Sequence, residues 1–138
     1  MTQIINKSTP GKERTQLSKA IVIAIREFMR QNKPDQETKD IVAFVILALH
    51  QISEGIDSSV AAWEKRGYWV KADKYRMAWK WTAVSSEELN SAFKKENWTE
   101  IAPIMLEIIS HFDTIKVSDQ HRMGTPWKNA YKKFSGLD

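Results

Sequence analysis

The stretch Ile41–Trp63, IVAFVILALHQISEGIDSSVAAW, decides the fold because its apolar residues recur with the period of an α-helix. Its first part, Ile41–Leu49, is apolar on every side, which predicts a helix surrounded by other helices. We expect this helix to begin after Asp35, a good N-cap residue, and to end before Gly67. Gly55 is the expected position of a bend. The apolar stripe consists of Ile41, Val45, Ala48, Leu49, Ile52, Ile56, Val60 and Trp63.

Shorter helical patterns flank this helix, and the alternating pattern of a β-strand is not found in the sequence. We therefore predict an all-α fold: a single-domain helical bundle of four to five helices with a docked short C-terminal helix. A length of 138 residues fits one domain. Residues 1–11 are expected to be flexible, and residues 117–138 to form a tail docked on the bundle. The other predicted helices cover residues 12–31, 68–83, 85–95, 97–112 and 126–134.

Local signals set the predicted boundaries of the later helices. Ser85 and Glu88 have the spacing of a capping box, so we expect a new helix to begin there. The segment Asn97–Glu100 repeats this pattern, and Pro103 is expected in the first turn of the helix that follows. Thr125–Pro126 has the pattern of an N-cap followed by proline at the first helical position, which predicts the last helix.

The predicted helix 68–83 has two apolar sides. Successive residues of a helix are rotated by about 100° around its axis, so residues seven apart lie almost in line. A helix with two apolar sides is either enclosed by its own chain or keeps one side for a partner. One side consists of Tyr68, Ala72, Tyr75 and Trp79, and the other of Val70, Met77 and Trp81.

Aromatic and basic residues alternate along Trp63–Trp81, WEKRGYWVKADKYRMAWKW. This stretch carries a net charge of +4, as large as that of the whole chain. Trp, Tyr, Met and Arg are enriched at the centres of protein interfaces, so we predict a non-catalytic interaction module for a protein partner or for self-association. The alternative is a monomer in which these rings form the core and lysine stems cover them. The predicted partner-binding residues are Tyr68, Trp69, Lys71, Tyr75, Arg76, Trp79 and Lys80.

Nucleic-acid binding is the alternative function of the same helix. Exposed rings stack on bases and cations neutralise phosphates, and the pI near 9.3 permits such contacts. The residues expected to act are Tyr75, Trp79, Lys71, Arg76 and Lys80, extended by Lys128, Lys132 and Lys133 of the tail. The charge is also explained by pairing within the fold, because residues 1–34, 35–62, 63–81, 82–112 and 113–138 carry +5, −4, +4, −3 and +2.

Two pairs of possible metal ligands lie one helical turn apart, His50 with Glu54 and Glu107 with His111. A carboxylate and an imidazole from each of two facing helices would bind a divalent metal, which makes a metal-dependent enzyme of the helical-bundle type a further alternative. Two ordinary surface pairs are the simpler interpretation.

His121 and Arg122 precede the last predicted helix and are candidates for binding an anion at its N-terminus. The competing interpretation is a latch, in which Trp127 anchors the tail on the bundle.

Composition excludes several other functions. Without cysteine there is no disulfide, thiolate metal site or cysteine nucleophile, and the isolated glycines form no phosphate-binding loop. We therefore expect no cofactor and favour a protein that is not an enzyme. The longest apolar run, Ile41–Leu49, is shorter than the ~20 residues of a membrane span, so we expect a cytoplasmic protein without membrane contact.

Overall fold

The computed structural model describes residues 10–31 and 33–136. This part of the chain is a bundle of five helices without a strand, so the predicted fold class is confirmed. The predicted flexible segment 1–11 lies outside the described residues except for Pro10 and Gly11, which begin the first helix. The helices are α1 (Pro10–Phe28), α2 (Gln36–Lys65), α3 (Trp69–Lys94), α4 (Trp98–Ser110) and α5 (Ala130–Gly136).

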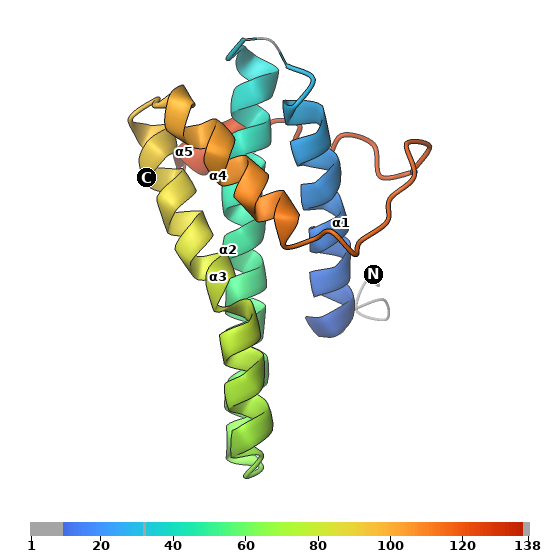
Figure 1. Cartoon of the computed structure of the whole chain (residues 1–138), viewed down its shortest axis with the longest axis vertical. Coiled ribbons are helices and arrows are strands. Elements are labelled where there is room, and N and C mark those ends of the chain that lie inside the picture. Colours follow the sequence, from blue (N-terminus) through green and yellow to red (C-terminus); the bar gives the residue numbers. More distant parts are fainter. Residues whose placement is uncertain (1–9, 32, 137–138) are drawn as a thin grey trace.

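Helix α2 is the centre of the bundle, as predicted (Figure 1). Asp35 caps it, since its Oδ1 accepts hydrogen bonds from the backbone N–H and the hydroxyl of Thr38 at 3.0 and 2.9 Å. These bonds stabilise the charged carboxylate and hold the pKa of Asp35 below its ordinary value. The helix is continuous through Gly55, and Ile41 and Leu49 are fully buried.

By length and composition, α2 would also be able to cross a membrane, with a mean hydropathy of 1.4 over its most apolar window. Half of that window is buried inside the structure, where α1, α3 and α5 pack against α2. The core helix of a soluble protein meets the same criteria. The central position of α2 in the bundle therefore accounts for its apolar composition.

A Schellman motif at Gly67 joins α2 to α3. The N–H of Tyr68 donates to the carbonyl oxygen of Trp63 at 2.9 Å, and the N–H of Gly67 to that of Glu64 at 3.0 Å. Gly67 has a φ of 84°, a left-handed conformation that glycine adopts without steric cost. The chain therefore reverses sharply, and α2 and α3 form an antiparallel hairpin whose closed end extends beyond the other helices (Figure 1).

Helix α3 is a single helix, so the prediction of two helices that meet at Ser85 is wrong. Ser85 and Ser86 are both buried inside α3, and the Ser86 hydroxyl donates to the carbonyl oxygen of Ile46 in α2 at 3.1 Å. Small side chains here let α3 pack closely on α2. This packing outweighs the local tendency of serine to begin a new helix.

Helix α4 departs from the prediction at its start. Pro103 lies in the second turn rather than the first, and Asn97 does not cap the helix, because its Oδ1 accepts from the Thr99 hydroxyl at 2.7 Å. The backbone holds this turn instead. Glu96 adopts a left-handed φ of 52°, and the N–H of Asn97 donates to the carbonyl oxygen of Ala92 at 2.9 Å.

The tail returns to the bundle and docks on it, as predicted (Figure 1). Trp127 is buried, and its Nε1 donates to Oε2 of Glu37 at 3.3 Å. The last helix begins at Ala130 rather than at Pro126. Asn129 has a left-handed φ of 63°, which interrupts the preceding turn before it becomes a helix.

Candidate binding surface on the α2–α3 hairpin

An outward face of α3 points away from the bundle. Its apolar members are strongly exposed, with exposed fractions of 63% for Trp69, 70% for Val70, 71% for Met77 and 46% for Val84. Seven residues make about two helical turns, so Val70, Met77 and Val84 lie in one line along the helix. Several exposed apolar side chains on one face of a helix indicate a candidate site of interaction. We define the outward face as Trp69, Val70, Met77, Lys80 and Val84.

The opposite side of α3 packs within the chain. Ala72 is fully buried, and the ring of Tyr75 packs on that of Trp63 with 4.7 Å between centroids. The guanidinium of Arg14 in α1 lies 5.1 Å from the ring centroid of Tyr75 and 5.2 Å from that of Trp79. Tyr75 and Trp79 are therefore engaged in the fold.

Helix α4 covers part of the second predicted apolar side. Trp81 stacks on the imidazole of His111 with 3.9 Å between centroids and 6° between planes, and meets Phe112 edge-on at 5.2 Å. Val70 and Met77, nearer the closed end of the hairpin, remain exposed. The second side of α3 is therefore covered at Trp81 but open at Val70 and Met77.

The closed end of the hairpin, which we call the tip, combines apolar side chains with cations. Trp69 and Val70 are its most exposed apolar residues. A groove of about 610 Å³ opens beside Val70 and reaches Trp63 and Tyr75. The tip consists of the exposed residues Tyr68, Trp69, Val70, Lys65, Arg66, Lys71 and Lys74.

Arg76 engages the two carboxylates next to the tip. Its guanidinium forms ion pairs with Glu64 and with Asp73, the latter at 2.9 Å. The ammonium of Lys71 lies 4.6 Å from the ring centroid of Trp63. One guanidinium balances only one of these two carboxylates, so the three residues together carry −1 and offset one of the four positive charges of the tip, which stays positive.

The structure divides the seven predicted partner-binding residues into two groups. The structure also adds three residues to the surface. Val70 and Met77 were predicted on an apolar side of the helix but not as binding residues. Val84 was left out because a new helix was predicted to begin at Ser85. The exposed group is Tyr68, Trp69, Lys71 and Lys80, and the group engaged within the chain is Tyr75, Arg76 and Trp79.

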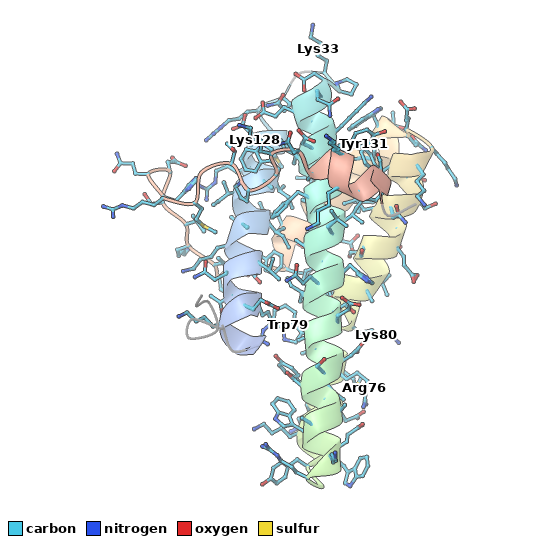
Figure 2. All side chains as sticks on the ribbon, turned by 180° about the vertical axis from the view of Figure 1, so that it is seen from behind. Lys33, Arg76, Trp79, Lys80, Lys128 and Tyr131 are labelled. Carbon is cyan, nitrogen blue, oxygen red and sulfur yellow. The ribbon has the colours of Figure 1, made fainter. Side chains whose placement is uncertain are left out.

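The tail lysines lie apart from this surface. Lys128 is near the end of the molecule opposite to Arg76 (Figure 2), and α5, which carries Lys132 and Lys133, packs on α2 at that same end. The tail therefore does not extend the predicted nucleic-acid-binding set on α3.

The four candidate metal ligands do not form one cluster. Nε2 of His50 and Oε2 of Glu54 are 3.4 Å apart on an exposed side of α2. Glu107 is exposed on α4, and His111 stacks on Trp81. Within residues 10–31 and 33–136, no three His, Cys, Asp or Glu side chains come together as a metal site requires. This part of the chain therefore gives the metal-dependent alternative no ligand set.

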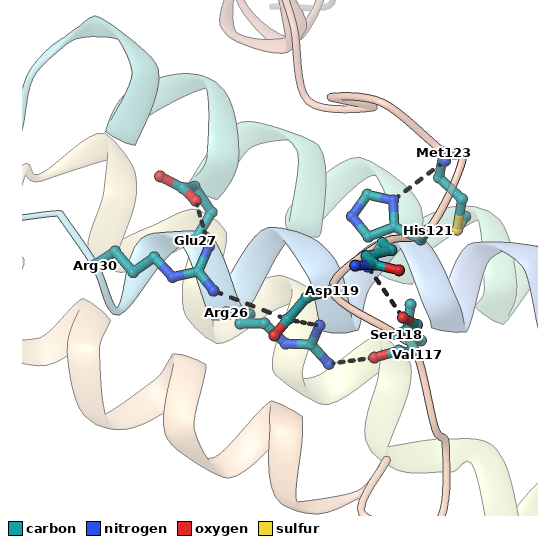
Figure 3. Close-up of polar contacts among 9 residues, drawn as sticks. Arg26, Glu27, Arg30, Val117, Ser118, Asp119, His121 and Met123 are labelled. Atoms are coloured by element: carbon teal, nitrogen blue, oxygen red, sulfur yellow. Dashed lines mark hydrogen bonds and ion pairs between the residues drawn. The ribbon is translucent and has the colours of Figure 1, made fainter.

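His121 and Arg122 lie in the loop between α4 and α5, and Figure 3 shows His121 there. Nδ1 of His121 accepts a hydrogen bond from the N–H of Met123 at 3.2 Å, whereas Arg122 is exposed. At the start of the last helix, where an external anion was expected, a carboxylate of this chain is bound instead. The N–H of Tyr131 donates to Oδ1 of Asp40 at 2.9 Å.

The contacts of this loop are those of a latch. Arg26 in α1 donates to the carbonyl oxygen of Val117 and to Oδ1 of Asp119, both at 3.0 Å (Figure 3). Arg30 approaches Asp119 at 3.9 Å and pairs with Glu27 at 3.2 Å. These bonds hold the loop on α1 between α4 and the docked α5.

Comparison with protein-family models, curated proteins and solved structures finds no match to this chain. Its function is therefore inferred from the residues of the hairpin themselves.

Proposed function

We propose that this protein is a non-catalytic helical interaction module that binds a protein partner, or another copy of itself, through the outward face of α3. The observation that carries the proposal is the line of Val70, Met77 and Val84, with exposed fractions of 70%, 71% and 46%. Full burial of such a side chain contributes roughly 1.5–3 kcal/mol, so covering the exposed part of these three would favour binding by part of that amount each, against the cost of association.

The composition of the outward face fits a protein partner. Met77 is flexible and adapts to irregular surfaces, and Trp69 is of the type that most often dominates interface energies. Exposed charges of both signs accompany these residues, Lys80 within the outward face and Glu87 and Glu88 further along α3. Charges of both signs beside an apolar line support recognition of another helix.

A photo-crosslinking experiment tests the proposal. A benzophenone amino acid replaces Met77 in the full chain, in cells of the source organism, and a second variant carries it at Ala61, which is exposed on α2 outside the outward face. We expect a defined protein adduct from position 77 and none from position 61. Equal labelling from both positions, or none from position 77, would contradict the proposal.

Nucleic-acid binding remains the second candidate, and the exposed rings of Tyr68 and Trp69 beside Lys65 and Arg66 favour it at the tip alone. The expected result is salt-sensitive quenching of tryptophan fluorescence by single-stranded nucleic acid. Unchanged fluorescence at low salt would remove this candidate.

A further inference from the structure

We propose that the tip of the hairpin binds the surface of lipid bilayers that contain anionic lipids. The tip is held beyond the other helices (Figure 1), so a flat surface reaches it without meeting the rest of the bundle. This proposal concerns the tip and does not depend on a protein partner at Met77. It changes the expectation of no membrane contact, which came from the length of the apolar runs and not from the surface of the folded chain.

Three apolar side chains of the tip would enter the bilayer interface. Tyr68, Trp69 and Val70 have exposed fractions of 55%, 63% and 70%. Tyr and Trp favour this interface because each joins an apolar ring to a polar O–H or N–H. The branched Val70 has no flat face on which a base would stack, so the three together fit lipid better than a nucleic acid.

The cations of the tip supply the attraction to anionic lipid. Lys65, Arg66, Lys71 and Lys74 are all exposed, and they come from the end of α2, the turn and the start of α3. Near an anionic membrane surface each such charge strengthens binding about fivefold. The nearest carboxylates, Glu64 and Asp73, both pair with Arg76, and the three residues together carry −1, which offsets only one of the four cations.

Polar groups behind the tip limit how deeply the hairpin would enter. The ion pairs of Arg76 with Glu64 and Asp73 lie behind the turn, and Asp57 and Ser58 are exposed further along α2. Charged side chains in the hydrocarbon core are costly. The hairpin would therefore rest in the interface with only its tip immersed.

Co-sedimentation with vesicles tests the proposal on the full chain. We compare vesicles of phosphatidylcholine with vesicles that contain about 30% phosphatidylserine, and expect binding to the second that weakens as salt shortens the Debye length. Lys65→Glu/Lys74→Glu should weaken this binding by roughly 30-fold or more, at about fivefold per cation. The matched control Lys132→Glu/Lys133→Glu makes the same charge change on exposed lysines of α5 and should alter binding less than about threefold. The neighbouring Tyr131 bonds Asp40, which lies 25 helical residues, or about 37 Å, from Lys65 and is therefore far beyond the ~10 Å Debye length.

Two further variants separate the possible outcomes. Trp69→Ser should weaken vesicle binding several-fold without changing thermal unfolding, whereas the uncharged change Met77→Gln should leave vesicle binding unchanged. The absence of an adduct from position 77 would contradict the protein-binding proposal, and the absence of vesicle binding would contradict the lipid proposal, so the two failures are distinguishable. The lipid proposal is overturned if anionic vesicles do not sediment the protein, or if both lysine pairs have equal effects. It is also overturned if a single-stranded oligonucleotide binds the tip while vesicles do not.

Discussion

Replacing Gly67 by alanine is expected to destabilise the protein, whereas the same change at Gly55 is expected to stabilise it. Gly67 has a φ of 84°, in the left-handed region, and Gly55 lies inside the continuous helix α2. A Cβ at either position would meet no atom within 4 Å. Backbone conformation, and not packing, therefore decides the sign of each effect.

The magnitudes follow from the two conformations. An L-residue in the left-handed region costs about 1–2 kcal/mol, and reduced freedom of the unfolded chain returns about 0.5 kcal/mol, so Gly67→Ala should lose about 1 kcal/mol. In a helix interior alanine is about 1 kcal/mol better than glycine, so Gly55→Ala should gain that amount. The two variants should therefore differ by about 2 kcal/mol, or roughly 6–8 °C in Tm for a chain of this size.

Urea unfolding followed by circular dichroism and by tryptophan fluorescence measures this difference. Equal slopes against urea would show that both variants change stability and not the compactness of either state. Gly67→Asn is the control, since asparagine tolerates the left-handed region better than alanine and should lose less. A destabilising Gly55→Ala would mean that α2 bends at Gly55, and a neutral Gly67→Ala would refute the left-handed turn that orients the tip.

Three further substitutions test other parts of the structure. Glu96→Gly should stabilise the protein by about 1 kcal/mol in the same urea assay, because Glu96 occupies a left-handed C′ position. Asp35 has a lowered pKa in the folded protein, so its charged carboxylate stabilises the fold. This contribution to the free energy of unfolding is complete above the ordinary pKa of about 4 and is lost as the pH falls through the lower pKa of the folded state. Thermal unfolding of the wild type and of Asp35→Ala should therefore converge in acid and differ at neutral pH. Phe134→Ala should cost about 3–5 kcal/mol, because Phe134 is buried, and hydrogen exchange should show faster exchange in α5 than in α4.

Both ends of α2 were predictable because their signals act within a few residues. Asp35 accepts bonds from Thr38 three positions on, and Gly67 reverses the chain through bonds to Trp63 and Glu64. The helical spacing of the apolar residues therefore predicted the central helix, and the capping residues at its two ends predicted its termini. The pattern at Ser85 was just as local, yet its prediction failed, because contacts with α2, which begins some fifty residues earlier, decide the conformation there.

The candidate site was predictable in position but not in membership. Composition placed the candidate site on α3, the helix on which the structure has the exposed residues Trp69, Val70 and Met77. Which rings are exposed depends on side chains distant in sequence: Arg14 covers Tyr75 and Trp79, and His111 covers Trp81. The sequence of residues 63–81 does not show which of its rings these distant side chains cover. The predicted binding residues therefore included some that pack inside the chain.

The unequal lengths of the helices explain why this surface exists. At about 1.5 Å per residue, the 30 residues of α2 span about 45 Å and the 19 of α1 about 28 Å. The last part of α2 therefore has α3 as its main neighbour, and two helices alone cannot bury both of their faces. On α2 the exposed positions there are small or polar, as at Asp57, Ser58 and Ala61, whereas α3 places Val70 and Met77 outward. A hairpin that only needed to remain soluble would be polar on both helices, so the apolar residues of α3 require an explanation other than packing within the chain, and binding provides one.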